Sequence, residues 1–198
     1  LYKSLDQPRD GSESLGNQLD RSQLMQVREV VQSDVLLELG CGCGNTGYYL
    51  FSNMPHKWYI LSDLSNRLGL VTAQQRWSDE DTAVAFMPLD FFHDSFPSVD
   101  VVLLDSILAD WDDDGCTTIL RNILRSIRQS GANLVISEAT RFSSSSHVDA
   151  IGKLALACAV QGRVREPEDV RSLVLAAGFT ACERVAESPM RFSLIARP

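Results

Sequence analysis

The chain has 198 residues and carries a formal net charge of −8 at pH 7. This excess of acidic groups argues against a nucleic-acid or anionic-membrane surface, because both require clustered Lys and Arg. The length suits one domain with a substantial core, and no apolar run is long enough to cross a bilayer. We therefore expect a cytoplasmic protein with no nucleic-acid partner and no membrane partner.

The cysteines form an odd and scattered set, which is typical of reduced thiols rather than of a disulfide framework. They are Cys41, Cys43, Cys116, Cys158 and Cys182. Cys41 and Cys43 stand two residues apart, but no further Cys or His has the spacing of a zinc site. We expect no metal site and interpret these two small residues as filling a tight turn.

Residues 1–17 are polar and contain Pro8, Gly11 and Gly16, which predicts a linker or an N-terminal arm. Residues 18–198 then make up the single folded domain. The chain starts with Leu rather than Met, which fits a segment of a longer polypeptide, although processing would leave the same start. Apolar residues at helical spacing between positions 18 and 31 predict an amphipathic helix that leads into the first strand.

Residues 35–39 form a short apolar run that predicts a strand buried on both faces of a parallel sheet. Glu38 stands near its carboxyl end, where open α/β sheets bind their ligands. Gly40, Gly42 and Gly44 follow, and they let the backbone turn sharply and approach a ligand without interference from a Cβ atom. The residues from Gly47 onward fit a helix that leaves this turn.

A glycine turn between a strand and a helix can bind nucleotides in several ways. The turn has no Gly-Lys-Ser/Thr ending, which argues against a phosphate-binding P-loop. The spacing Gly42-x-Gly44-x-x-Gly47 formally matches a dinucleotide fingerprint. The acidic residue just before the glycines argues against a dinucleotide, and a glycine-rich turn without a ligand is the remaining alternative.

Residues 58–61 and 83–87 predict the second and third strands, with a helix over residues 68–77 between them. Asp63 follows the second strand, where a carboxylate can accept hydrogen bonds from both ribose hydroxyls; capping of the next helix is its alternative role. Asp90 and Phe91 follow the third strand. An acid beside an aromatic ring could bind the adenine amino group while the ring packs on apolar surface.

Residues 99–104 predict a fourth buried strand that ends at Asp105, and the acids at positions 112–114 suit the first turn of a helix that Gly131 ends. Residues 133–137 predict a fifth strand with Glu138 at its carboxyl end. A polar loop at 143–146, helices over 148–160 and 166–177, and a hairpin over 182–186 and 192–196 complete the chain. Strands that alternate with helices indicate a three-layer, Rossmann-like α/β fold.

The string ELGCGCG, at residues 38–44, resembles motif I of the class I S-adenosylmethionine (SAM)-dependent methyltransferases. The stretch from Asp90 to Glu138, together with GRVREPEDVRSLVLAAGF from Gly162, resembles the catalytic domain of the small-molecule O-methyltransferases. That family includes plant enzymes that methylate phenols and hydroxyindoles, and bacterial polyketide-tailoring enzymes. The resemblance covers roughly residues 34–198 and implies the class I methyltransferase fold, with a seven-stranded sheet that is parallel except for its last strand.

The resemblance implies SAM as the cofactor, bound at the carboxyl edge of the sheet. The glycines of the turn would hold its methionine part, Asp63 its ribose, and Asp90 with Phe91 its adenine. Either Glu38 or Asp105 would meet the cationic amino group. The expected cofactor-binding residues are Glu38, Gly40, Gly42, Gly44, Asp63, Leu64, Asp90, Phe91 and Asp105.

The sequence departs from the family pattern in three respects. The family normally carries an N-terminal helical dimerisation domain, which residues 1–17 are not expected to form, so a monomeric domain of a larger protein is one expectation. The family's general base, a His, corresponds to Ala109, and a lysine often found four residues earlier corresponds to Asp105. Of the two acids that flank the base in plant enzymes, Glu138 matches one, and the other falls near Val164.

Methyl transfer mainly requires the nucleophile and the methyl group to be held in line at about 3 Å. Proton removal from a phenol or alcohol adds typically about 10²–10⁴-fold, and an enol or acidic hydroxyl needs that help less. Since Ala109 cannot accept a proton, the candidate catalytic residues are Glu138, Asp110 and His147. Each candidate also has an alternative, non-catalytic interpretation. Glu138 could be a structural carboxyl of the core, Asp110 could cap the helix that begins at 112–114, and His147 could be a solvated side chain.

We therefore expect O-methylation of a hydroxyl or enol on a small or acyl-carrier-protein-bound metabolite of secondary metabolism. A domain excised from a polyketide synthase is one origin that fits these expectations. The alternative is a methyltransferase fold that has lost catalysis and serves as a binding or scaffold module, which the Ala at position 109 favours.

Overall fold

The computed structural model describes residues 21–73, 83–140, 162–188 and 191–198. Seven strands form one sheet in the order β3-β2-β1-β4-β5-β7-β6. All pairings are parallel except those of β7, which runs antiparallel to both β5 and β6. The expected sheet, parallel except for its last strand, is confirmed. The strands are β1 Val35–Leu39, β2 Trp58–Asp63, β3 Val84–Pro88, β4 Val101–Asp105, β5 Asn133–Ala139, β6 Ala181–Glu187 and β7 Arg191–Arg197.

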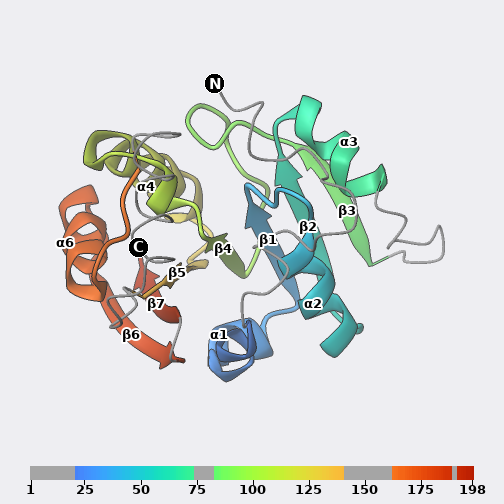
Figure 1. The fold of residues 1–198 in the computed structure, drawn as a ribbon, viewed down its shortest axis with the longest axis horizontal. Coiled ribbons are helices and arrows are strands. Elements are labelled where there is room, and N and C mark those ends of the chain that lie inside the picture. Colours follow the sequence, from blue (N-terminus) through green and yellow to red (C-terminus); the bar gives the residue numbers. More distant parts are fainter. Residues whose placement is uncertain (1–20, 74–82, 141–161, 189–190) are drawn as a thin grey trace, which may run out of the picture.

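Helices cover both faces of this sheet, as expected for a three-layer fold (Figure 1). The described α-helices are α1 Arg28–Gln32, α2 Asn45–Asn53, α3 Ser65–Ala73, α4 Asp113–Ile127 and α6 Pro167–Ala177, and two 3₁₀ helices are η3 Ser22–Gln26 and η4 Leu108–Asp110. On β1, Leu37 packs in the core cluster with α4 and α6, whereas Leu36 packs in the cluster with η3, α1 and α2. Alternate strand residues therefore bury opposite faces of the sheet.

The segment before β1 differs from the single helix predicted over residues 18–31. The described part consists of η3 and α1, which are separated at Val27, a residue with extended backbone angles of φ −79° and ψ 109°. Leu24, Val27 and Val30 are all fully buried. Helical spacing thus identified the buried residues correctly. It did not identify the break at Val27, because two short helices can bury these three apolar side chains as well as one continuous helix can.

Two helix ends follow capping rules that can be read from the sequence. Asp112 caps α4, because its Oδ1 accepts a hydrogen bond from the Gly115 N–H at 2.8 Å. The prediction that Asp110 caps this helix is therefore wrong. The last helix, α6, ends at Gly178, whose φ of 111° lies in the left-handed region that glycine tolerates.

Several predictions fall outside the described residues. These are the N-terminal arm at 1–17, the end of the helix at 74–77, the polar loop at 143–146 with His147, and the helix at 148–160. The helix α3 begins at Ser65, three residues before its predicted start. Within the part of the chain that the structure describes, no helix is both long enough and apolar enough to span a bilayer.

Candidate functional site

The strand ends place two groups of polar side chains on opposite faces of the sheet, because successive strand residues alternate between faces. On β1, β4 and β5, the residues packed in the cluster with α1 and α2 are Leu36, Leu103 and Val135. The residues two positions further along share that face, and they are Glu38, Asp105 and Ser137. Glu138 belongs to the other face, which α4 and α6 cover.

The glycine turn after β1 has the backbone that its composition predicts. Gly40, Gly42 and Gly44 have φ values of 69°, 54° and 71°, all in the left-handed region. A Cβ atom on Gly40 would lie 2.5 Å from Ile107 Cδ1 and 3.2 Å from Phe91 Cε1, so a side chain there would displace Ile107 and would also be strained by the positive φ. A Cβ atom on Gly42 would meet no described atom within 4 Å, so the turn is open to a ligand at this residue.

Asp63, at the end of β2, is joined directly to this turn. Its Oδ2 accepts a hydrogen bond from the Gly42 N–H at 2.9 Å, and its Oδ1 accepts one from the Leu64 N–H at 2.8 Å. Arg67 Nε lies 3.7 Å from Oδ1. The Asp63 carboxylate is therefore oriented by two backbone donors at the edge where a ribose was expected, and the neighbouring Leu64 is exposed.

Asp90 and Phe91 follow β3, and the Phe91 ring lies against Gly40 of the glycine turn. Asp90 Oδ1 accepts a hydrogen bond from the Phe92 N–H at 2.9 Å, and its Oδ2 lies 3.0 Å from His93 Nδ1. Although burial opposes it, these two hydrogen bonds hold the pKa of Asp90 below its usual value. Asn122 of α4 donates to the Phe91 carbonyl at 2.9 Å and so fixes this turn, a role that sequence reasoning missed.

Asp105, at the end of β4, lies in a buried ionic network. Its Oδ1 pairs with Arg191 Nη2, and its Oδ2 accepts a hydrogen bond from Thr46 Oγ1 at 2.5 Å. Arg21 Nε lies 3.5 Å from the same Oδ2 and 2.5 Å from Thr46 Oγ1. Sequence reasoning missed Arg191, Arg21 and Thr46. The signal for Arg191 was a cation at the start of the strand RFSLIAR, whose next five residues are apolar except for one Ser.

Glu38 lies beside this network and is 3% exposed. Burial and the nearby Asp105 raise its pKa from the ordinary 4.5 to about 8, so the carboxyl is largely protonated at neutral pH. Its Oε2 has no hydrogen-bond partner among the described residues. A buried acceptor without a donor is rare in folded proteins and is a candidate point of ligand contact.

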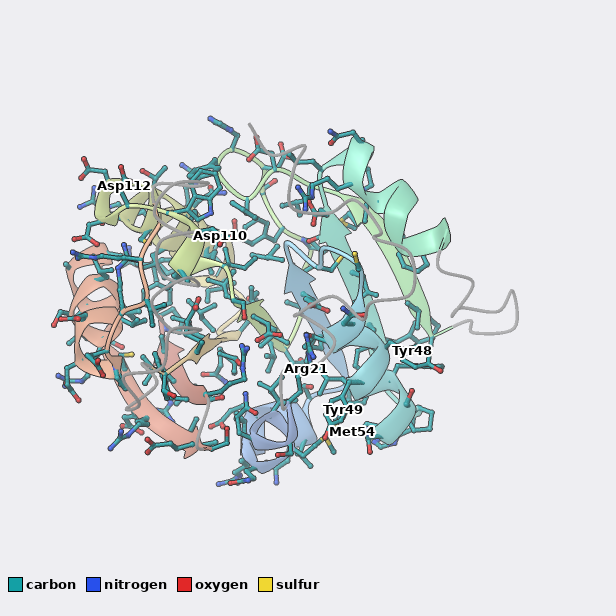
Figure 2. All side chains as sticks on the ribbon, viewed as in Figure 1. Arg21, Tyr48, Tyr49, Met54, Asp110 and Asp112 are labelled. Carbon is teal, nitrogen blue, oxygen red and sulfur yellow. The ribbon has the colours of Figure 1, made fainter. Side chains whose placement is uncertain are left out.

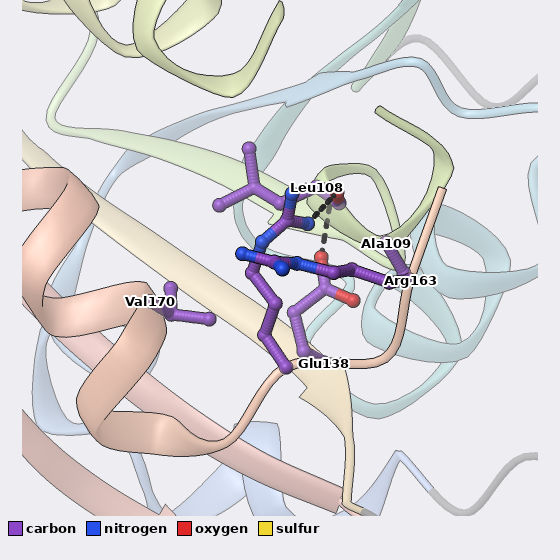
Figure 3. Close-up of a pocket in the computed structure, with 6 residues that line it drawn as sticks. Leu108, Ala109, Glu138, Arg163 and Val170 are labelled. Carbon is purple, nitrogen blue, oxygen red and sulfur yellow. Dashed lines mark hydrogen bonds between the residues drawn. The ribbon is translucent and has the colours of Figure 1, made fainter. Parts of the chain in front are cut away.

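On the opposite face, Glu138 ends β5 and is 4% exposed. Its Oε1 accepts a hydrogen bond from the Leu108 N–H at 2.8 Å, and burial raises its pKa to about 7. Glu138, Leu108 and Ala109 line a small pocket (Figure 3). Arg163, Arg165 and Val170 complete its lining. The arrangement offers a carboxyl group that titrates near neutral pH, as a general base requires.

Residues 12–180 match the family model of the O-methyltransferase domain. The chain belongs to this family. Acetylserotonin O-methyltransferase from Gallus gallus is 32% identical over 145 residues, which are 73% of this chain and 42% of that protein. 3'-Hydroxy-N-methyl-(S)-coclaurine 4'-O-methyltransferase 1 from Papaver somniferum is 30% identical over 166 residues, which are 81% and 45% of the two chains.

Solved structures of O-methyltransferases share the fold. Human N-acetylserotonin methyltransferase in complex with SAM superposes with a TM-score of 0.74 and 23% identity, over 93% of this chain and 52% of that chain. The mitomycin 7-O-methyltransferase MmcR gives a TM-score of 0.71 and 20% identity, over 84% and 49%. The chain thus spans about half the length of these relatives.

The structure brings Ala109, which the sequence resemblance aligns with the family's base, next to Glu138 (Figure 3). Asp110 is half-buried in η4, near the start of α4, whereas Arg21 lies on the α1 side of the sheet (Figure 2). Val164 is also half-buried, between Arg163 and Arg165 of the pocket lining. The candidate base His147 lies outside the described residues.

The raised pKa of Glu38 predicts a pH-dependent stability. Between about pH 4.5 and pH 8 the folded chain keeps a proton on Glu38 that the unfolded chain releases. The folded state therefore binds more protons, and the free energy of unfolding should fall as pH rises through this window. Thermal unfolding from pH 5 to 8 should show a smaller decline in Glu38→Gln than in the wild type.

Glu183→Gln, a change at an exposed carboxyl of β6, is the control and should keep the wild-type pH dependence. Glu138 titrates in the same direction, with a pKa of about 7, so Glu38→Gln should retain part of the decline. Equal declines in the wild type and Glu38→Gln would contradict a buried, protonated Glu38.

Proposed function

We propose that this chain binds SAM at the carboxyl edge of its sheet and transfers the methyl group to a hydroxyl or enol oxygen. The observation that carries the proposal is the Asp63 carboxylate, which the backbone of the glycine turn orients at 2.9 Å from Gly42 N. A carboxylate in that position can accept hydrogen bonds from a ribose diol. Membership of the O-methyltransferase family supports the reaction class.

The residues of the turn fit SAM. Gly42 leaves open space where a side chain would otherwise stand, and Phe91 packs against Gly40 within reach of an adenine ring. The buried Glu38 Oε2 has no partner among the described residues, and a cationic ammonium group beside it would favour the ionised carboxylate, which accepts the hydrogen bond. Bound SAM supplies a methyl group already activated by its sulfonium, so the protein's part is to orient the acceptor and to receive its proton.

Glu138 is the group proposed to receive that proton. It lies beside Ala109, where the family's base would stand, and its pKa of about 7 is close to the optimum for a general base at neutral pH. A carboxylate is a weaker base than many phenolates. The pairing therefore favours acceptors with an acidic hydroxyl or an enol, whose proton leaves more easily.

The proposed acceptor is a small or acyl-carrier-bound hydroxylated metabolite of secondary metabolism. Two relatives are named for small hydroxylated molecules, acetylserotonin and a coclaurine, which supports a small acceptor. The net charge of −8 disfavours nucleic acid and anionic membranes as partners. Cytoplasmic localisation and action as a monomeric domain of a polyketide synthase belong to the same proposal.

The test combines binding and turnover. Calorimetry with S-adenosylhomocysteine should detect binding, and a mass-spectrometric screen of phenolic, enolic and acyl-carrier-bound hydroxyls should detect methylation. Glu138→Gln should lower turnover by at least about 100-fold, because general-base catalysis contributes about 10²–10⁴-fold. Its dissociation constant for S-adenosylhomocysteine should stay within about twofold of the wild type, since Glu138 is not among the residues proposed to hold the cofactor.

The exposed-site variant Glu183→Gln should keep full turnover and binding. Full turnover in Glu138→Gln would remove Glu138 from the mechanism, and failure of the wild type to bind S-adenosylhomocysteine would refute the cofactor assignment.

One observation favours a second candidate function. Ala109 cannot accept a proton, and the second flanking acid of the family pattern falls near Val164, so neither Ala109 nor Val164 supplies the ionisable group that the resemblance implies. A module that binds SAM without catalysis would keep Asp63 and the glycine turn but not the base. Tight binding of S-adenosylhomocysteine with no methylation across the whole screen would establish this alternative.

A further inference from the structure

Arg165 holds the turn that carries Ala109. Its side chain is almost fully buried, and its Nη1 donates to the Leu108 carbonyl at 2.6 Å. Its Nη2 donates to the Trp111 carbonyl at 2.8 Å and to Asp113 Oδ1 at 2.7 Å. One planar guanidinium thus joins both ends of the turn to the first residue of α4, a geometry that the fork of Arg permits.

The segment that leads to Arg165 is fitted closely to the same turn. A Cβ atom on Gly162 would lie 1.9 Å from the Ala109 carbonyl oxygen and 2.9 Å from the Ala109 carbonyl carbon. No residue other than glycine fits there without displacing backbone. Residues 162–165 therefore contact the turn at three residues: Ala109 through Gly162, and Leu108 and Trp111 through Arg165.

Leu108 links this contact to the candidate base. Its N–H donates to Glu138 Oε1 at 2.8 Å, while its C=O accepts from Arg165 at 2.6 Å (Figure 3). Arg165 and Glu138 thus bind the two polar backbone groups of one residue. The Leu108 N–H and C=O belong to successive peptide units that meet at the Leu108 Cα atom. A shift of the turn that moves this Cα atom would therefore move both groups and weaken the hydrogen bond to Glu138.

We propose that Arg165 is a positioning residue for Glu138: it fixes the Leu108–Trp111 turn so that the Leu108 N–H keeps the carboxyl directed at the pocket beside Ala109. The inference rests on the proposed function, in which Glu138 receives the acceptor's proton. Arg165 acts through Leu108 and needs no contact with the acceptor.

The pKa of Glu138 reports whether the Leu108 N–H still binds its carboxyl. Burial raises the pKa of Glu138, while the Arg191 charge and the Leu108 N–H lower it. The titratable or charged groups that act on Glu138 electrostatically or line its pocket come from four elements and from the segment before α6: Arg191 of β7, Asp105 of β4, Asp110 of η4, Cys116 of α4, and Arg163 and Arg165. Loss of the Leu108 N–H alone should raise the pKa further.

The experiment follows the Glu138 carboxyl by ¹³C NMR in the 198-residue chain labelled at its glutamate side-chain carboxyls. Glu138→Gln assigns the signal. Arg165→Met, which keeps much of the apolar stem, should raise the Glu138 pKa by about one unit, as expected for loss of a hydrogen bond to a charged group. Arg163→Met is the matched control, because Arg163 also lines the pocket and pairs with Asp113, through Nη2 at 2.7 Å.

Arg165→Lys separates charge from position, because an ammonium keeps the charge but cannot span both carbonyls and Asp113. Positioning predicts that Arg165→Lys retains at least half of the shift seen in Arg165→Met, with Arg163→Met shifting by less than about 0.3 units. A wild-type Glu138 pKa in folded Arg165→Lys, or equal shifts in the Arg163 and Arg165 variants, would overturn the proposal. If Arg165→Met does not fold, Arg165→Lys alone decides between these outcomes.

The NMR titration requires neither SAM nor turnover, so it can fail independently of the proposed function. In an active chain, the acidic limb of the kcat profile of Arg165→Met should move to higher pH by the same amount, while the dissociation constant for S-adenosylhomocysteine stays within about twofold of the wild type. An unshifted kcat profile beside a shifted NMR titration would exclude Glu138 as the base without affecting the positioning itself.

Discussion

Asp63→Ala is expected to weaken binding of S-adenosylhomocysteine by at least about 100-fold. In the proposed site the carboxylate accepts two ribose hydroxyls, and a hydrogen bond to a charged group contributes about 1.5–3 kcal/mol. Two such bonds correspond to about 10²–10⁴ in the dissociation constant. The change also removes the acceptor of the Gly42 N–H, which loosens the turn that would hold the methionine part. Isothermal titration calorimetry measures the effect.

Asp100→Ala is a matched control for this change. Asp100 also accepts two backbone N–H groups, those of Asp34 and Val35, each at 2.9 Å. It precedes β4 and therefore lies at the amino edge of the parallel strands, opposite the candidate site. Both variants should lose a comparable amount of stability, but only Asp63→Ala should lose binding. Equal affinity in the two variants would contradict the assignment of Asp63 to the ribose.

The sequence allowed the sheet and its ligand edge to be predicted, because buried parallel strands are apolar and short and their carboxyl ends carry the polar residues. Asp63 and the glycine turn were found together on this basis, although 21 residues separate Gly42 from Asp63. The face of the sheet on which each side chain lies could be assigned only once the pairing register of the strands was known. Glu38 and Asp105 then fell on one face, and Glu138 on the other.

The partners of those acids could not be predicted from local patterns. Arg191 follows Asp105 by 86 residues and reaches it only because β7 inserts beside β5 in the antiparallel direction. Arg21 lies in a segment whose spacing fitted one helix but which is divided at Val27. Arg165 stands in an irregular segment before α6 and binds backbone carbonyls, which no residue pattern reveals. Each contact depends on long-range packing rather than on neighbours in the chain.

Arg191→Met should lower the free energy of unfolding by about 3 kcal/mol, the lower end of the usual cost of breaking a buried ion pair, because Arg21 Nε still lies 3.5 Å from Asp105 Oδ2. The Arg191 side chain is fully buried, and Asp105 is 4% exposed. Arg191 also donates to Ser106 Oγ at 3.0 Å and to Ser137 Oγ at 2.9 Å, so further buried acceptors would lose a donor. Against a typical total stability of about 5–15 kcal/mol, this is a large fraction. Chemical denaturation measures it.

Arg184→Met is the control, because it removes an arginine from β6, the strand that pairs with the strand of Arg191. Arg184 pairs with Glu187 at 3.3 Å, but both side chains are more than half exposed, so the variant should lose no more than about 1 kcal/mol. If the buried charge is the cause, adding Asp105→Asn to Arg191→Met should recover at least about 1 kcal/mol, because the double variant no longer buries a carboxylate whose remaining ionic partner is Arg21. If the losses of Arg191→Met and Asp105→Asn simply add in the double variant, the effect comes from packing of the Arg191 stem. If Arg191→Met alone loses as little stability as Arg184→Met, the pair is not buried in solution.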